Sequence, residues 1–251
     1  MVKRMGRGIF LLTAACSLFS GIPVRAAIGG PGVMKAEVEK IIKYESGIEI
    51  DRLLDAQETD QIVVVLGTGM DNRSIHVAYF KKDEAGDWQE EFYVPGYCGY
   101  YGMSDNKTEG DRRTPTGAYT FTKAFGILDD PGAVLDYKKL DYDDYWVDDS
   151  TSASYNQMVS TKVVAKTWNS AEHLINVNPC YNYVLALGYN ENCIPGKGSA
   201  IFLHGLHPQK NWSEGCIAID QEYVKQLVCQ VDAQTKIVIA ADTDALLYLE
   251  D

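Results

Sequence analysis

Two side chains toward the C-terminal end of the chain have the types needed for nucleophilic catalysis. His204 ends the apolar run Ser199–Leu203 and precedes Gly205, and Cys216 follows a dozen residues later in the segment Ser213–Cys216. The attacking form of cysteine is the thiolate, so a cysteine beside a base is a common nucleophile at neutral pH. If the intervening segment folds back as a loop, the imidazole and the thiol meet. This pattern predicts acyl transfer through a thioester.

Neighbouring residues could support this pair. Gly215 can adopt a backbone conformation closed to other residues, which would aim nearby N–H groups at an oxyanion. Ser213 would orient the loop or donate to substrate, although turn hydrogen bonding explains it equally well. His207 is a competing base, because it lies nearer to Cys216 in sequence, but it precedes Pro208 in an expected loop. The alternative is structural: a buried cysteine on a strand and a hydrogen-bonded histidine.

Other polar residues have weaker patterns. Arg112 and Arg113 could hold a substrate carboxylate bidentately, or could be solvated turn residues. His76 and His173 have no catalytic neighbours in the sequence and are expected to be surface or core residues. Neither a CxxC pair, an HExxH motif nor a glycine-rich phosphate loop occurs, so the sequence predicts neither a metal nor a nucleotide cofactor.

Short apolar runs separated by glycine-rich turns predict a mainly β fold, a sandwich or a barrel, rather than βαβ units. The expected strands are Ile62–Leu66, Ser74–Lys82, Trp88–Val94, Ala118–Lys123, Tyr181–Tyr189, Ser199–His204, Ile217–Ile219 and Lys236–Ala240. An amphipathic helix with Asp220 as its N-cap is expected over Asp220–Val231. The segment Asp129–Asn156 is acidic and tyrosine-rich, which predicts a lid or surface insertion rather than core, and Trp168–Leu174 is expected to form one or two helical turns.

The N-terminus has the pattern of a signal peptide. Lys3, Arg4 and Arg7 precede an apolar run over residues 9–22, and Val24-Arg25-Ala26 offers a cleavage site. We therefore expect a signal peptide over residues 1–26, a short helical lead over 27–60 and a catalytic domain over 61–251. An uncleaved anchor and a lipoprotein box at Thr13–Cys16 are the alternatives. No second apolar stretch approaches membrane length, so no stable membrane span is expected after cleavage.

The net charge and the number of cysteines bear on the binding partners and on the presence of a free thiol. The chain has a net charge of −12, and this acidity opposes binding to nucleic acid. Five of the six cysteines lie beyond the expected signal peptide, and an odd number in an exported protein indicates a free thiol, for which Cys216 is the candidate. Cys180 and Cys193 bracket a loop and are the most plausible disulfide pair, unless Cys98, Cys180, Cys193 and Cys229 are all reduced.

Three ordered motifs together resemble the YkuD-like L,D-transpeptidase catalytic domain of bacterial cell-wall enzymes. They are the turn at Asp111–Tyr119 (DRRTPTGAY), the strand end Phe202–Gly205, and Ser213–Ile217. The resemblance covers residue 61 to the C-terminus. It implies a mainly β, sandwich-like fold with a cysteine and a histidine in a cleft under a lid.

The resemblance also implies a reaction. Cys216 would attack the carbonyl before D-Ala in a peptidoglycan tetrapeptide stem, His204 would be the base, and a backbone carbonyl near Gly205 would orient it. The acyl group would pass to the amine of a second stem, and carbapenems would acylate Cys216. The chain departs from the family pattern at Glu214, where many members have His, and at Ala218, where many have Arg or Asn. An L,D-carboxypeptidase with the same pair and a non-catalytic wall-binding module are the rival functions.

Overall fold

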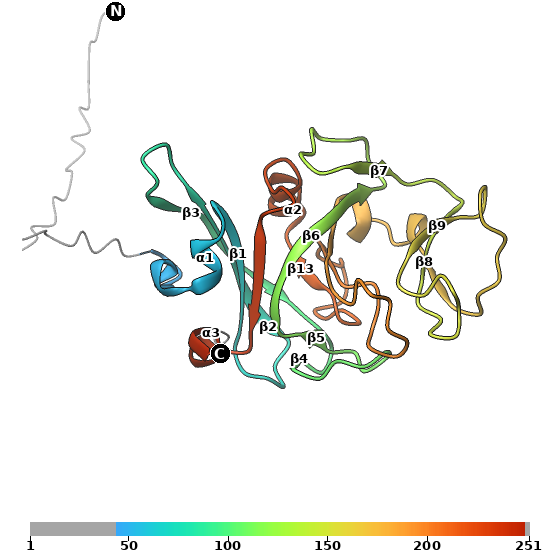
Figure 1. Cartoon of the computed structure of the whole chain (residues 1–251), viewed down its shortest axis with the longest axis horizontal. Coiled ribbons are helices and arrows are strands. Elements are labelled where there is room, and N and C mark those ends of the chain that lie inside the picture. The colour runs from blue at the N-terminus through green and yellow to red at the C-terminus, as the bar shows by residue number, and fades with distance from the viewer. Residues whose placement is uncertain (1–43, 249–251) are drawn as a thin grey trace, which may run out of the picture. The chain divides into compact units, whose positions relative to one another are not determined.

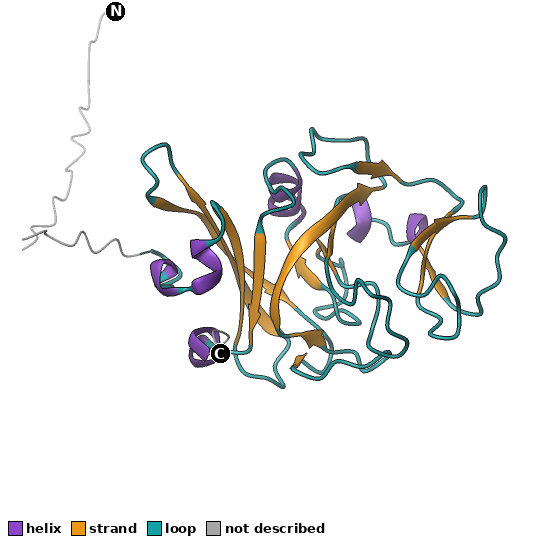
Figure 2. Ribbon diagram, in the orientation of Figure 1, coloured by secondary structure: helices purple, strands orange, loops and turns teal. Residues whose placement is uncertain are grey.

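The computed structural model describes residues 44–248, and these all belong to one compact unit. Its strands are β1 (Gln61–Gly67), β2 (Ser74–Lys82), β3 (Trp88–Tyr97), β4 (Met103–Ser104), β5 (Thr114–Pro115), β6 (Gly117–Gly126), β7 (Tyr137–Lys139), β8 (Asp144–Val147), β9 (Met158–Ser160), β10 (Ala171–His173), β11 (Val184–Leu187), β12 (Phe202–Gly205), β13 (Ile217–Ile219) and β14 (Lys236–Ala240). Its helices are α1 (Leu54–Gln57), α2 (Gln221–Val228) and α3 (Thr243–Tyr248), with 3₁₀ turns η1 (Ile50–Arg52), η2 (Leu174–Asn176) and η3 (Cys180–Asn182). The fold is mainly β, as the sequence predicted (Figure 2).

The main sheet closes on itself. Its nine strands follow the order β11-β12-β13-β3-β2-β1-β14-β6-β7, and β6 pairs with β11 as well as with β14. Eight strands therefore form a closed ring, with β7 attached to β6 (Figure 1). Most neighbours are antiparallel, but β1–β14, β12–β13 and β6–β7 are parallel pairs.

The apolar run of β1 is continuous because both of its faces are buried. Val63 and Val65 belong to the largest core cluster, whereas Ile62 and Val64 belong to a second cluster. The second cluster also contains side chains from residues 48–56 and Leu246 of α3. The described part of the predicted helical lead thus forms η1 and α1, and it packs on β1, β2 and β14.

Helix α2 begins where the sequence predicted. The Asp220 carboxylate accepts a hydrogen bond of 3.0 Å from the Glu222 amide, which satisfies one of the free N–H groups of the first turn. Its apolar face, Val224, Leu227 and Val228, is buried in the largest core cluster. The helix contacts β11 and β12, and so it supports the strand that ends at His204.

The predicted lid is a folded insertion with its own sheet. Strands β8, β9 and β10 pair in the order β10-β8-β9, and Val147, Val159 and Trp168 form a small core. Trp146 packs at 4.8 Å between ring centroids against Phe202 of β12. The expectation that residues 129–156 are too polar for a core was wrong for Trp146, Val147 and Tyr155, which are buried. The expectation of helical turns over 168–174 was also wrong, since residues 171–173 form β10.

The structure distinguishes between the disulfide-bonded and the reduced cysteines that the sequence left open. All five in the described segment are free thiols, so the predicted Cys180–Cys193 disulfide is absent and the reduced alternative is the one found. The predicted signal peptide lies outside the described residues. None of the helices described is long and apolar enough to cross a membrane.

Candidate active site

Adjacent parallel strands position His204 and Cys216. Leu203 pairs with Ile217 and His204 with Ala218, so Cys216 lies beside Phe202, just before β13. Successive side chains of a strand point to opposite faces, and therefore Phe202, His204 and Cys216 share one face of the sheet. Leu203 and Ile217 point to the other face and into the largest core cluster. The imidazole and the thiol are diagonal neighbours across this pair of strands.

The imidazole of His204 is fixed in one tautomer. Its Nδ1 lies 2.8 Å from the Gly205 carbonyl oxygen, which can only accept, so Nδ1 carries the proton and Nε2 the lone pair. Tyr181 packs edge-on against the ring at 5.3 Å between centroids. Burial lowers the pKa of His204 to about 4, although the Gly205 carbonyl favours the charged form. At neutral pH the side chain is an uncharged base.

The thiol of Cys216 is buried and protonated. Its side chain belongs to the apolar cluster of Trp146 and Phe202, and Sγ donates a hydrogen bond of 3.2 Å to the Ala200 carbonyl. Burial raises the pKa of Cys216 well above its ordinary value, and the nearby carboxylate of Glu172 raises it further. The resting pair is therefore a neutral thiol and a neutral imidazole rather than a thiolate–imidazolium ion pair.

Hydroxyl groups hold the loop that precedes Cys216. Ser213 Oγ donates to the Cys216 carbonyl at 2.6 Å and accepts from the Gly215 amide at 3.1 Å. Thr114 Oγ1, fully buried, donates to the Gly215 carbonyl at 2.7 Å and accepts from the Gly99 amide at 2.9 Å. Gly215 has a φ of 147°, which side chains rarely adopt. Its own N–H is engaged by Ser213.

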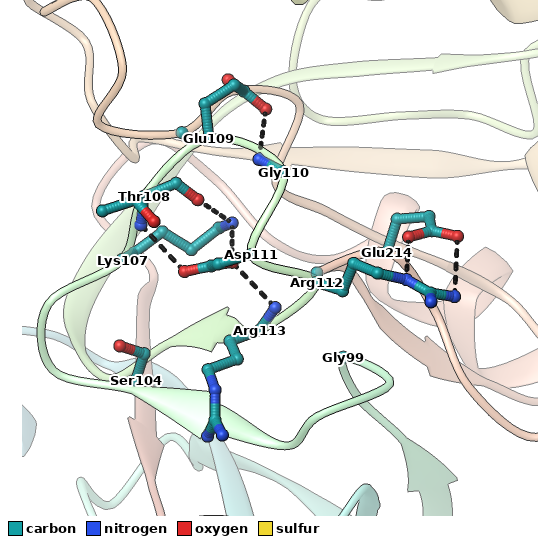
Figure 3. A network of polar contacts seen from close by, with 12 residues as sticks. Gly99, Ser104, Lys107, Thr108, Glu109, Gly110, Asp111, Arg112, Arg113 and Glu214 are labelled. Atoms are coloured by element: carbon teal, nitrogen blue, oxygen red, sulfur yellow. Dashed lines mark hydrogen bonds and ion pairs between the residues drawn. The ribbon is translucent and has the colours of Figure 1, made fainter.

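The turn that contains Arg112 and Arg113 is a scaffold for this loop (Figure 3). Asp111 accepts hydrogen bonds from the Thr108 and Arg113 amides and pairs with buried Lys107 at 2.6 Å. Arg112 forms a bidentate pair with Glu214 at 2.6 and 3.2 Å. This contact explains the acidic residue at position 214, where related sequences were expected to have histidine.

Aromatic rings also contact the Arg112 guanidinium, whose carbon lies 4.4 Å from the Tyr100 centroid and 4.7 Å from the Trp212 centroid. Arg113 pairs with Asp71 at 2.9 Å and donates to the Met103 carbonyl. Both arginines are therefore engaged by protein groups. A substrate carboxylate would have to displace Glu214 or Asp71 to bind them.

A cavity of about 190 Å³ brings the reactive side chains together. His204, His207, Ser213 and Cys216 line it, as do residues to which the sequence analysis gave no part in catalysis or binding. These are Tyr97, Glu172, Val177, Cys180, Tyr181, Lys210, Trp212 and Glu214. Arg112, Arg113, His76 and His173 are not among the residues described as lining it. His76 instead stacks on Tyr93, and His173 on Tyr145.

Glu172 is the most informative of the residues that were missed. It lies on β10 of the insertion, and its Oε2 accepts a hydrogen bond of 2.7 Å from the Tyr181 hydroxyl. Desolvation raises the pKa of Glu172 to about 7, and the charges of Asp148, Glu109 and Glu214 raise it in the same direction. Nothing in the local sequence marks this residue, because its position depends on how the insertion folds over β12.

Within residues 44–248, no three His, Cys, Asp or Glu side chains are grouped closely enough to hold a metal ion. The groups of this cavity that can take part in acyl transfer include the Cys216 thiol, the His204 imidazole with a free Nε2 and the Glu172 carboxyl group.

The closed barrel and this cavity define a β-barrel domain with a cysteine–histidine site. The family model of the L,D-transpeptidase catalytic domain, YkuD, matches residues 71–239, which is more than half of the chain and includes both side chains. The chain belongs to this family. Residues 71–239 are thus an L,D-transpeptidase catalytic domain by family.

A search of curated proteins gave no match. Among solved structures, the chain is similar to a fused Zn-dependent amidase/peptidase/peptidoglycan-binding protein of Clostridium acetobutylicum, with 13% identity, a TM-score of 0.35 and coverage of 72% of this chain and 52% of that one. An L,D-transpeptidase from Mycobacterium smegmatis has 12% identity, a TM-score of 0.33 and coverage of 72% and 59%. The Ldtfm–avibactam carbamoyl enzyme has 12% identity, a TM-score of 0.34 and coverage of 72% and 49%. The chain spans about half the length of these structures.

Proposed function

We propose that this protein is an exported L,D-transpeptidase that cross-links peptidoglycan stem peptides through a thioester on Cys216. The observation that carries the proposal is the shared cavity of Cys216 and His204, on adjacent strands of a domain of this family. Export rests on the signal-peptide pattern of residues 1–26.

In the first half-reaction, the Cys216 thiol turns from the Ala200 carbonyl toward Nε2 of His204. Sγ attacks the carbonyl carbon before D-Ala while Nε2 takes the thiol proton. The C–N bond breaks, the same proton passes to the departing D-Ala amine, and a thioester remains. Because burial disfavours both the thiolate and the imidazolium, proton transfer accompanies the attack rather than preceding it.

In the second half-reaction, the amine of another stem attacks the thioester carbon. His204 takes a proton from the attacking nitrogen and returns it to the sulfur as the C–S bond breaks. Gly205 stabilises the imidazolium that forms in each step, because its carbonyl accepts from Nδ1. Ser213 and Gly215 fix the backbone that presents the sulfur, and His207 lies on the wall of the cavity.

The test is the intact mass of the protein after incubation with a carbapenem. We expect one covalent adduct, absent from Cys216→Ala. Cys180→Ala is the matched control, since Cys180 lines the same cavity and is also a free thiol. An adduct that survives Cys216→Ala and disappears in Cys180→Ala would overturn the assignment of the nucleophile.

Product analysis with a synthetic peptidoglycan tetrapeptide and an added amine tests the reaction class. Amide products support transpeptidation, whereas trimmed tripeptide alone would identify the L,D-carboxypeptidase. Absence of any turnover by the wild-type protein, together with wall binding that Cys216→Ala leaves unchanged, would identify a non-catalytic module.

A further inference from the structure

Two carboxyl groups line the cavity without a role in the proposed reaction, and of these Glu214 is paired with Arg112 whereas Glu172 has no cationic partner in the described part of the chain. It faces the space shared by Cys216 and His204, and Tyr181 holds it in place by a hydrogen bond while packing against the His204 ring. Tyr181 engages Oε2, and the other oxygen, Oε1, can accept from a ligand. Glu172 is thus a rigidly placed acceptor next to the sulfur.

The surroundings of Glu172 favour a positively charged ligand. Asp148 Oδ1 is buried without a hydrogen-bond partner among the described residues, and its charge acts on Glu172. Lys210 lies on the same cavity, but its Nζ is over the Trp212 ring at 4.8 Å. The titratable groups that act on or face Glu172 are Asp148 from the segment after β8, Glu109 and Glu214 from loops, Tyr181 of η3 and Cys216, together with Tyr97, Cys180, His204, His207 and Lys210 on the cavity wall. The charges that raise the pKa of Glu172, those of Asp148, Glu109 and Glu214, are all negative.

Resting on the proposed function, we infer that Glu172 binds the ammonium group of the acceptor and takes its proton before the amine attacks the thioester. The acceptor reaches the cavity as R–NH₃⁺, which has no lone pair and cannot attack. One N–H bond breaks, its proton forms an O–H bond on Glu172, and a neutral amine is left beside the thioester carbon. Attack then proceeds with His204, and Glu172 releases its proton to water after the product leaves.

The electrostatics agree with this role. A carboxyl group with a pKa of about 7 is balanced between its two forms at neutral pH, which suits a general base. The small cavity, about 190 Å³, means that any amine within reach of the thioester carbon is also close to this carboxylate. The donor supplies no such cation at its scissile bond, because an amide nitrogen is uncharged.

The test compares Glu172→Gln with the wild type, using a synthetic tetrapeptide as donor and two acceptors. Cadaverine is cationic at neutral pH, whereas hydroxylamine is largely uncharged. We expect Glu172→Gln to lower transfer to cadaverine about 100-fold, the scale of a lost general base, and to lower transfer to hydroxylamine by less than about threefold. The rising limb of wild-type transfer to cadaverine should end in a plateau above about pH 7, whereas in Glu172→Gln transfer should keep rising with pH, because only the free-amine fraction of cadaverine then reacts.

Two further variants complete the design. Glu222→Gln removes an exposed carboxylate on α2 and serves as the matched control. Tyr181→Phe removes the hydrogen bond that favours ionised Glu172, and it should shift the limb of the pH profile to higher pH. This shift tests the assignment even if Glu172→Gln folds poorly.

The experiment separates failure of this inference from failure of the proposed function. If the wild type forms no thioester with the tetrapeptide, the proposed function fails and this inference fails with it. If the thioester forms but Glu172→Gln transfers to both acceptors at the wild-type rate, only this inference is overturned. Equal losses with cadaverine, hydroxylamine and water would also overturn it, because they indicate a positioning role rather than proton removal from an ammonium group.

Discussion

The buried hydroxyl of Thr114 connects the loop before Cys216 to the rest of the barrel. In Thr114→Val the shape of the side chain is retained, but the Gly215 carbonyl loses a donor at 2.7 Å and the Gly99 amide loses an acceptor at 2.9 Å. An unsatisfied buried group costs about 1–3 kcal/mol, so the two together predict a loss of about 2–6 kcal/mol in the free energy of unfolding. At about 2–4 °C per kcal/mol, the melting temperature should fall by roughly 4–24 °C.

Urea unfolding followed by tryptophan fluorescence measures this loss. Thr122→Val is the matched control, because Thr122 is an exposed threonine of β6 with only a long hydrogen bond of 3.4 Å to the Ala186 carbonyl. It should change stability by less than about 0.5 kcal/mol. Thr114→Ser keeps the hydroxyl and should recover most of the loss. If Thr114→Val is no less stable than Thr122→Val, the view that this hydroxyl fixes the cysteine loop is refuted.

Two other predictions follow from the site. Burial lowers the pKa of His204 from 6.5 to about 4, so between these pH values the unfolded chain binds a proton more readily than the folded chain. The resulting contribution to the free energy of unfolding, about 3 kcal/mol, is complete above pH 6.5 and is lost as the pH falls toward 4. Glu172 has the opposite effect on stability, since its raised pKa gives stability that is lost as the pH rises through about 7. The measurement is therefore the free energy of urea unfolding of wild type and of His204→Gln, compared at pH 7.5 and at pH 4.5. Equal pH dependence in both proteins would contradict the His204 assignment. In labelling with iodoacetamide at pH 8, followed by peptide mapping, partly exposed Cys193 should be modified before Cys216 and Cys98. Burial raises the pKa of the Cys216 and Cys98 thiols, that of Cys98 to about 11, and so leaves little thiolate in either. Faster labelling of Cys216 than of Cys193 would show that a thiolate–imidazolium ion pair exists at rest.

Much of the barrel could be predicted from local sequence. The apolar run of β1, the alternation of β2 and the Asp220 cap of α2 are local signals, and each matches an observed element. The approach of His204 to Cys216 could be inferred from two strands joined by a short segment. Closure of the ring by pairing of β6 with β11 could not be inferred, because strand pairing between distant segments leaves no local sequence pattern.

The insertion was the least predictable part. Its acidic and tyrosine-rich composition hides a small core whose members, such as Trp146, face β12. Glu172 enters the cavity only as a result of this packing. The ion pairs of the arginines were unpredictable for a related reason: their partners, Glu214 and Asp71, are distant in sequence.

The parallel pairing of β12 and β13 has an evolutionary consequence. Parallel neighbours require a crossover, and here residues 206–216 make it while also supplying His207, Lys210, Trp212 and Glu214 to the cavity wall. β12 and β13 are held by the barrel and position His204 and Cys216, whereas residues 206–211 of the connecting segment are largely exposed. Substitutions or insertions in residues 206–211 can therefore reshape which peptides enter while the spacing of sulfur and imidazole is inherited unchanged.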